Sequence, residues 1–98
     1  MANNLFVSYD LIDPGQNYAA VIAAIKKQGS WAKIQYSFFY LDTEKSAEQV
    51  AKAVRSVMDQ NDSLIVIDAT NNTAYWFNLS PEVSKHLQDR WNDRQYAA

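Results

Sequence analysis

Apolar and polar side chains alternate near the beginning of the chain, which is the pattern of a strand with one buried face. Over residues 5–11 every second side chain is apolar, while Phe6, Ser8 and Asp10 occupy the other face. Residues 13–15 read Asp-Pro-Gly, a combination that favours a turn, and its aspartate is placed to cap a helix. The pattern therefore predicts a first strand that leads into a helix.

A three-to-four-residue period then predicts two long helices. The first is expected over residues 16–28, with Gly29 just beyond two lysines at its carboxyl end. The second is expected over residues 47–60, where Ser46 and Gln49 have the spacing of a capping box. Each helix carries an apolar stripe, formed by Tyr18, Val21, Ile22 and Ile25 in the first and by Ala47, Val50, Ala51, Val54, Val57 and Met58 in the second.

Three further segments have the composition of strands. Residues 34–41 are β-branched and aromatic, and their centre is apolar on both faces, which favours a bend that divides the run into two short strands. Residues 64–69 form an apolar run typical of a strand that is buried on both faces. Asn71 and Asn72 favour a turn before residues 74–77, so the last two segments are expected to form a hairpin.

The C-terminal segment has the signals of a short helix. Ser80 is placed as its cap, with a proline and an acidic residue in the first turn behind it. The helix is expected to end near Asn92 and to leave a loose tail over residues 93–98. Apolar residues recur along it at helical spacing, at Val83, Leu87 and Trp91.

The order of these elements predicts an α+β protein. Two amphipathic helices can cover one face of a four-stranded antiparallel sheet, so we expect a ferredoxin-like fold with a C-terminal hairpin strand and a short helix. Neither a repeat nor a linker divides the chain, which predicts a single domain over residues 1–98, with a core at 1–79 and a C-terminal helix and tail at 80–98. The buried core is expected to include Val7, Val21, Ile25, Val54, Met58 and Ile67.

Composition and charge exclude several function classes. The 98 residues are 48% hydrophobic, which is enough for a folded core, and they include no cysteine, so disulfides and thiolate zinc sites are excluded. A reducing cytoplasm is therefore the expected location, with no targeting or membrane segment. A net charge of −2 argues against a strong nonspecific surface for duplex binding. With only two glycines, no glycine-rich phosphate loop is present.

Three segments carry a resemblance to a known family. The strand end at residues 7–11, Gly29 followed by the run at residues 33–39, and the late strand at residues 62–67 resemble the CRISPR-associated protein two family. This resemblance covers residues 5–67. The chain is similar, more weakly, to the virulence-associated protein D toxins, which share the ferredoxin-like fold.

The resemblance implies a symmetric dimer whose sheets pack face to face, with a metal-dependent phosphodiesterase site at its axis. Asp10 matches the aspartate that is the reputed metal ligand of that site. Lys33 stands where an arginine is usual, and Ser37 and Phe38 match a serine-aromatic pair, which implies a nucleic-acid contact at these residues. Residues 71–98 extend beyond the usual end of the family.

Asp10 has two explanations from its position alone. A carboxylate at the end of an otherwise apolar strand must be solvated, hydrogen-bonded or bound to a cation. It either caps the following turn or binds Mg²⁺ or Mn²⁺. One carboxylate per chain is a poor magnesium site, so the metal hypothesis requires a two-fold axis that supplies a second Asp10. Such an ion would polarise a phosphodiester and lower the pKa of a bound water.

Asp68 is the candidate for a second metal ligand. The first and last strands of the predicted core are neighbours, so Asp68 is expected to lie near Asp10. Its alternative role is to satisfy the backbone of the following hairpin turn. His86 is the only histidine and has no partner at metal-ligand spacing, so we interpret it as a surface residue.

Lys26, Lys27 and Lys33 form the densest basic cluster, and the aromatic residues that follow suggest that bases stack on a sheet beside charged side chains. The alternative is structural, because lysines stabilise a helix C-terminus and aromatic strand residues usually belong to a core or a dimer interface. The three consecutive aromatic residues 75–77 cannot all face one core, which favours a homodimer contact.

Two functions from different classes remain. The first is a noncatalytic homodimer that serves as a nucleic-acid-related or protein-interaction module, with RNA, DNA or an unidentified protein as partner. The second is an Mg²⁺- or Mn²⁺-dependent endoribonuclease or DNase with Asp10 from both subunits at the dimer axis. The acidic balance and the single carboxylate per chain favour the first, whereas the strand end at Tyr9 and Asp10 favours the second.

Overall fold

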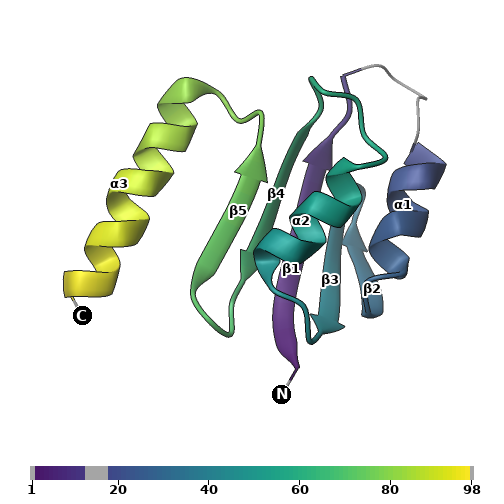
Figure 1. The fold of residues 1–98 in the computed structure, drawn as a ribbon, viewed down its shortest axis with the longest axis horizontal. Helices are drawn as coiled ribbons and strands as arrows, with labels where there is room; N and C mark the ends of the chain where they lie inside the picture. The colour runs from purple at the N-terminus through teal and green to yellow at the C-terminus, as the bar shows by residue number, and fades with distance from the viewer. Residues whose placement is uncertain (1, 13–17, 98) are drawn as a thin grey trace.

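A computed structural model describes residues 2–12 and 18–97 of the chain (Figure 1). The predicted Asp-Pro-Gly turn and its helix cap lie outside these residues. The elements are β1 (Asn3–Asp10), α1 (Tyr18–Lys26), β2 (Ser30–Gln35), β3 (Phe38–Thr43), α2 (Ala47–Arg55), β4 (Ser63–Asp68), β5 (Thr73–Phe77) and α3 (Pro81–Ala97).

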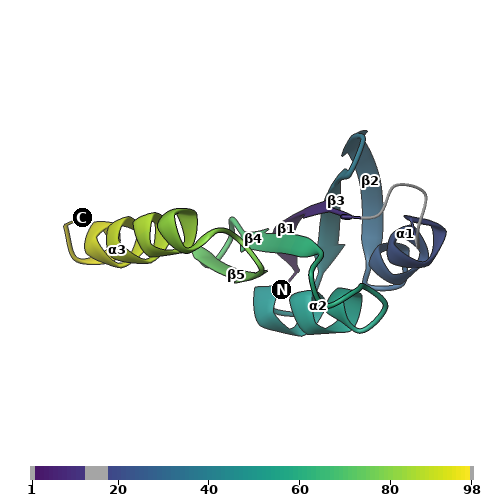
Figure 2. The same cartoon turned by 90° about the horizontal axis from the view of Figure 1, so that it is seen from above.

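The five strands form one antiparallel sheet in the order β2-β3-β1-β4-β5. β1 lies between β3 and β4, and α1 and α2 lie on the same side of the sheet (Figure 2). This arrangement confirms the predicted α+β, ferredoxin-like fold, in which β5 extends the sheet beyond β4 and α3 follows it. Neither α1 nor α2 covers the opposite side of the sheet.

The hydrophobic core fills the space between the sheet and the two helices. Five of the six residues predicted to be buried belong to this core, namely Val7, Val21, Ile25, Val54 and Met58. The prediction for Ile67 was wrong. Ile67 pairs with Phe6, so it lies on the open side and is only half-buried. Its neighbours Val66 and Asp68 point into the covered side, because successive strand residues face opposite ways.

The aromatic run in the middle of the chain is divided, as predicted, into two short strands. β2 ends at Gln35 and β3 begins at Phe38, with Tyr36 and Ser37 in the turn between them. Ser37 adopts a positive φ of 65°, a left-handed backbone conformation found at the third residue of type II turns. β2 begins at Ser30, earlier than expected. It is an edge strand with every residue exposed, so its N-terminal half shows no apolar alternation.

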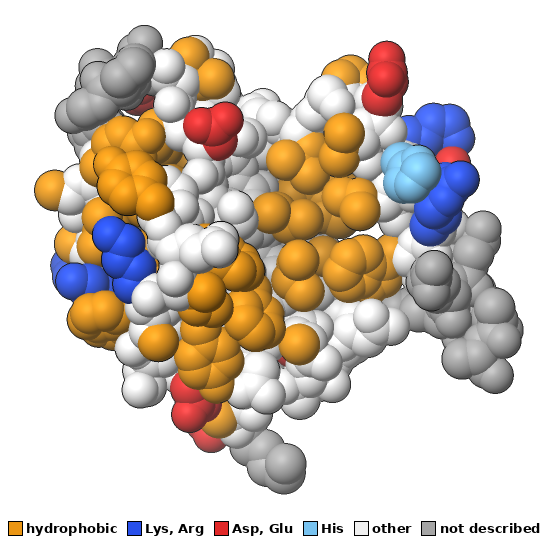
Figure 3. All heavy atoms as spheres, turned by 180° about the vertical axis from the view of Figure 1, so that it is seen from behind, with side chains coloured by type: hydrophobic (Ala, Val, Ile, Leu, Met, Phe, Trp, Pro, Cys, Tyr) orange, Lys and Arg blue, Asp and Glu red, His pale blue; other side chains and the backbone are white. Residues whose placement is uncertain are grey.

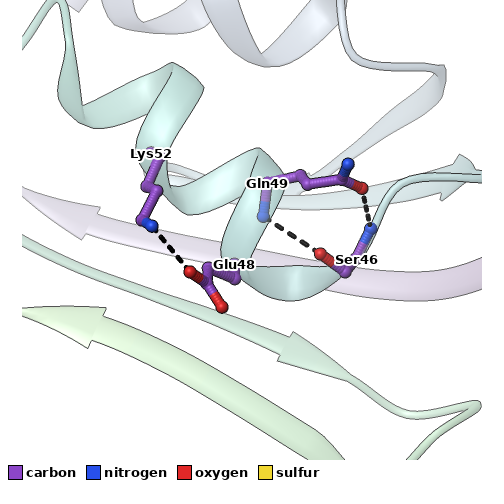
Figure 4. Close-up of polar contacts among 4 residues, drawn as sticks. All are labelled: Ser46, Glu48, Gln49 and Lys52. Carbon is purple, nitrogen blue, oxygen red and sulfur yellow. Dashed lines mark hydrogen bonds and ion pairs between the residues drawn. The ribbon is translucent and has the colours of Figure 1, made fainter.

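The predicted capping box begins α2 (Figure 4). The Ser46 hydroxyl accepts from the Gln49 backbone N–H at 3.1 Å, and the Gln49 side-chain oxygen accepts from the Ser46 N–H at 2.9 Å. One turn later, Lys52 donates to Glu48 at 2.6 Å. The two contacts between Ser46 and Gln49 satisfy backbone donors at the start of the helix, and the Lys52–Glu48 ion pair adds a side-chain contact along its surface. The helix ends at Arg55, earlier than the predicted residue 60, and turns follow it.

α3 stands beside the sheet, beyond β5 (Figures 1 and 2). Ser80 caps it as predicted, since its hydroxyl accepts from the Val83 N–H at 3.2 Å. The expectation of a helix end near Asn92 was wrong, because α3 continues to Ala97. Residues 93–97 contain no glycine or proline that would stop a helix. None of the helices in the described part of the chain is long and apolar enough to cross a membrane.

Candidate functional site

The side of the sheet that α1 and α2 leave open carries a continuous group of apolar side chains, which we call the open face (Figure 3). Phe6 stands near its centre, with its ring 5.9 Å from that of Phe38 and 5.6 Å from that of Tyr40. All these side chains are half-buried, so part of their surface contacts only solvent in one chain. The apolar members of the open face are Phe6, Phe38, Tyr40, Ile65, Ile67, Ala74 and Trp76.

Asp10 ends β1 on the open face and is exposed. It pairs with Ser63 at the start of β4. Immediately before it, Tyr9 points into the core, and its backbone N–H donates to the Ser37 carbonyl at 3.2 Å. Asp10 therefore lies at the end of the sheet that carries the β2–β3 turn. Its carboxylate is available to solvent or to a ligand.

The expectation that Asp68 lies near Asp10 was wrong. The two strands are neighbours but antiparallel, and Asp68 pairs with Leu5 near the other end of β1. Asp68 is 1% exposed and faces the covered side of the sheet. Its two oxygens accept from the backbone N–H groups of Thr70 and Asn71 and from the Asn71 amide, at 2.7–3.0 Å. It therefore has the alternative role considered above, which is to satisfy the β4–β5 turn.

Asp62 is the carboxylate that β4 brings to the Asp10 end of the sheet, and sequence reasoning missed it. It is 2% exposed, and its oxygens accept from the backbone N–H groups of Ile12 at 2.8 Å and Asp59 at 2.9 Å. These bonds connect the end of the first strand to the loop after α2. In the sequence, Asp62 follows Asn61, and this pair was interpreted as a helix breaker. That pattern suggests a turn, and it does not indicate that Asp62 connects two distant segments.

The described acidic and histidine side chains are spread over the molecule. Within residues 2–12 and 18–97, no group of three or more His, Cys, Asp or Glu side chains is placed to hold an ion. His86 lies on α3, and it is exposed.

The three predicted nucleic-acid residues do not share one face. Lys33 pairs with Phe39, so it lies on the same side of the sheet as the helices, and its ammonium group is 5.2 Å from the centre of the Tyr36 ring. Phe38 lies on the open face against Phe6. Ser37 occupies the turn between the two strands. The structure thus separates Lys33 from Phe38 by the thickness of the sheet.

Lysines and aromatic rings meet along β2, at the right of Figure 1. The Lys26 ammonium group lies 4.2 Å from the centre of the Trp31 ring, which is 44% exposed. Tyr36 is 77% exposed and its ring is 6.1 Å from that of Tyr18. Sequence reasoning had identified the lysines but not Trp31, because Trp31 precedes the segment predicted to be a strand.

A protein-family model matches most of the chain. Residues 3–75 match the model of CRISPR associated protein Cas2. The chain belongs to this family. No curated protein and no solved structure matches the chain closely enough to be counted as a relative. The resemblance noted in the sequence is thereby confirmed at the level of the family.

The match to the Cas2 family includes β1 to β4 and ends within β5. Asp10, Lys33 and all of the open face up to Ala74 thus lie inside the family region, whereas α3 lies outside it. α3 is attached through two indole groups. Trp76 donates to the Ser84 hydroxyl at 2.9 Å, and Trp91 donates to the Asn72 carbonyl at 3.0 Å. This helix is an addition to the family core; it lies beyond β5 (Figure 2) and contacts the open face at its β5 margin through Trp76.

Proposed function

We propose that this Cas2-family protein acts as a homodimer whose two chains pair through the open face. In this proposal the dimer has a function related to nucleic acids and does not catalyse a reaction. The observation that carries the proposal is the apolar open face described above. An antiparallel sheet that faces water on one side normally carries polar residues there. Here that side carries Phe6, Ile65, Ile67 and Trp76. A contiguous apolar patch of this kind is typical of a surface that binds another molecule when the protein functions.

A second copy is the occupant that best fits this surface. In a two-fold dimer the same patch is used by both chains, so an apolar face can cover its own copy without a special partner. A stable interface needs about 800 Å² from each chain, which is a reasonable area for one face of a five-stranded sheet. The small size of the domain adds a reason, because short chains bury a smaller share of their surface alone.

Light scattering tests the dimer directly. At micromolar concentration we expect a mass close to twice the 11.2 kDa of one chain. A mass equal to one chain at every concentration would overturn the homodimer and, with it, any site shared between two subunits.

The noncatalytic part of the proposal is supported by the carboxylates that the structure describes. Asp68 and Asp62 use their carboxylate oxygens in hydrogen bonds to the backbone of neighbouring turns. Asp10 is the exposed carboxylate on the open face near the β2–β3 turn. Magnesium in enzymes is usually held by one or two carboxylates together with substrate phosphates. A catalytic site would therefore need the partner's Asp10 or a bound substrate to complete it, whereas a noncatalytic role needs neither.

A metal-dependent phosphodiesterase, acting on RNA or DNA, is the second candidate. One observation favours it: Asp10 is exposed and lies on the face through which we propose that two chains pair. In such a dimer an Asp10 from each subunit would be available to the same ion, Mg²⁺ or Mn²⁺. Without an ion, two close carboxylates repel each other, so binding of a divalent cation would stabilise the dimer.

Manganese titration separates the two candidates. If the metal site exists, MnCl₂ raises the melting temperature of the wild type but not of Asp10→Ala, and nuclease activity requires both the ion and Asp10. Asp42→Ala is the matched control, because Asp42 is an exposed carboxylate on the same face at the opposite end of the sheet. If wild type, Asp10→Ala and Asp42→Ala respond identically to manganese, the phosphodiesterase candidate is rejected.

A further inference from the structure

The charge of the chain is unevenly distributed, although its net charge is only −2. Residues 18–41 contain Lys26, Lys27 and Lys33 and no acidic residue, so all eleven acidic residues lie elsewhere in the chain. This segment comprises α1, β2 and most of β3. Figure 3 shows basic side chains among hydrophobic ones at this side of the molecule. The overall acidity therefore conceals a local basic surface.

Two aromatic rings are exposed on the same surface, and each has a lysine beside it. Trp31 is 44% exposed, with the Lys26 ammonium group 4.2 Å from its ring centre. Tyr36 is 77% exposed, with the Lys33 ammonium group 5.2 Å from its ring centre. The ring centre of Trp31 is also 6.2 Å from that of the buried Phe39, and this packing holds the indole in place. We call Lys26, Trp31, Lys33 and Tyr36 the β2 surface.

We propose that the β2 surface binds single-stranded nucleic acid, with bases stacked on Trp31 and Tyr36 and phosphates paired with Lys26 and Lys33. This inference rests on the proposed nucleic-acid-related function and specifies its ligand. In a duplex the bases are already stacked and paired, so they are not free to stack on exposed aromatic rings unless base steps are opened. Unpaired bases stack on such rings without regard to sequence, while nearby lysines neutralise the backbone.

The energetics favour an exchange of contacts on binding. An exposed contact between a lysine and an aromatic ring is weak, and its free energy corresponds to a factor of about two to five in an equilibrium constant. A base stacked on an aromatic side chain raises the binding constant by about 5- to 150-fold. A base that takes the place of a lysine over a ring therefore gains more than is lost, and the released ammonium group becomes available to a phosphate.

A protein strand is the main alternative occupant, because β2 lies at the edge of the sheet and only β3 pairs with it among the described strands. Two features argue against it. The strand is irregular, with a shift of register between Lys33 and Gln35 that interrupts the edge. A lysine within an edge strand is also a common means of discouraging the addition of another strand. The basic charge and the exposed rings together favour a polyanion that carries bases.

Fluorescence anisotropy with three labelled probes tests the proposal at low salt. The probes are a single strand of about 20 nucleotides, which exceeds one site, a strand of equal length made of abasic sites, and the corresponding duplex. We expect the base-bearing strand to bind at least about fivefold more tightly than the abasic strand, and more tightly than the duplex.

Variants assign the effect to individual side chains. Tyr36→Ala should weaken binding of the base-bearing strand by about 5- to 150-fold and leave abasic binding unchanged, whereas Tyr36→Phe should keep the wild-type affinity. Lys33→Ala should weaken both strands alike and lower the salt dependence by about one charge. Lys85→Ala, an exposed lysine on α3, is the matched control and should change neither.

The outcomes distinguish this inference from the function on which it rests. Equal affinity for the base-bearing and abasic strands, with Tyr36→Ala silent, would overturn base stacking but keep nucleic-acid binding through phosphates. No binding of any probe would overturn both. If Tyr36→Ala or Trp31→Ala instead lowers the mass measured by light scattering, the β2 surface is a protein interface and the proposal is wrong.

Discussion

Gly29 shows how a single residue is constrained by the tertiary structure. From the sequence it was interpreted as a helix stop, since it follows the lysines at the end of α1. In the structure a Cβ at this position would collide with the Asp42 carbonyl oxygen and lie 2.9 Å from the Thr43 Cβ. The chain passes so close to the end of β3 here that no side chain fits.

Gly29→Ala is therefore expected to lower the free energy of unfolding by about 1–3 kcal/mol, because backbone must move to make room for the methyl group. Urea denaturation measures the change. Ser30→Ala is the matched control at an exposed neighbouring position, where the expected change stays within about 0.5 kcal/mol. Equal effects of the two substitutions would contradict the close approach.

Tyr9 provides a prediction about pH. Burial raises its pKa above the ordinary value of 10.0, although a hydrogen bond with Ser37 acts in the opposite direction. The folded state therefore holds the phenolic proton more tightly than the unfolded state does. The corresponding stability is fully present below pH 10 and is lost as the pH rises through the folded pKa.

Tyr9→Phe removes this titration while keeping the ring. The difference in unfolding free energy between wild type and Tyr9→Phe should be constant from pH 7 to 9 and then shift against the wild type above about pH 10. Denaturant titrations of both proteins at each pH give that difference, in which the ionisation of lysines cancels. A difference that stays constant up to pH 11 would mean that the phenol is solvated in the folded protein.

At the scale of elements, the capped starts of α2 and α3 follow the local sequence, whereas their C-terminal ends do not lie where the sequence predicted them. α2 begins at Ala47 because Ser46 and Gln49 satisfy each other's backbone N–H groups, as the spacing predicted. The strands depend more on their surroundings. β2 was predicted only in part, because an exposed edge strand has no alternation of apolar and polar residues to reveal it.

Ser46→Ala is expected to destabilise the protein by about 1 kcal/mol, since it leaves the Gln49 backbone N–H without its side-chain acceptor. Thermal denaturation followed by circular dichroism measures the loss. Ser56→Ala is the control at the other end of the helix, where the hydroxyl donates only to the Ala53 carbonyl. The capping interpretation is rejected if Ser56→Ala costs as much as Ser46→Ala.

At the scale of the whole molecule, the open face is the dominant feature. Ile67 lies within it, opposite Phe6 on β1 and Ala74 on β5. In one chain alone a lysine at this position would reach solvent, so it should be tolerated. In the proposed dimer it would place a charge in an apolar contact, where burial of an unpaired charge is costly.

Ile67→Lys is therefore expected to remain folded but to lower the mass measured by light scattering from two chains to one. Val57→Lys is the control, because Val57 is an apolar residue of similar shape, 36% exposed, that follows α2 on the covered side of the sheet. It should leave the mass unchanged. Dimers of Ile67→Lys at the wild-type concentration would exclude the open face as the interface.

Local patterns in the sequence were sufficient for the elements that depend on neighbouring residues. Helix periods, caps and hairpin turns involve residues a few positions apart, so their signals survive in the linear chain. The division of the aromatic run at Tyr36 and Ser37 and the cap at Ser46 are examples. The order of the elements and the resemblance of residues 5–67 also predicted the ferredoxin-like fold and the family.

Only the tertiary structure decided how the candidate residues are combined. Asp68 was expected beside Asp10, but the antiparallel register of β1 and β4 places them at opposite ends of the pair. The pairing of β2 with β3 places Lys33 and Phe38 on opposite sides of the sheet. It also places Trp31 at the surface beside Lys26. Register and facing depend on pairing between segments distant in sequence, and a shift of one residue reverses the side of every residue in a strand. No local pattern contains that information.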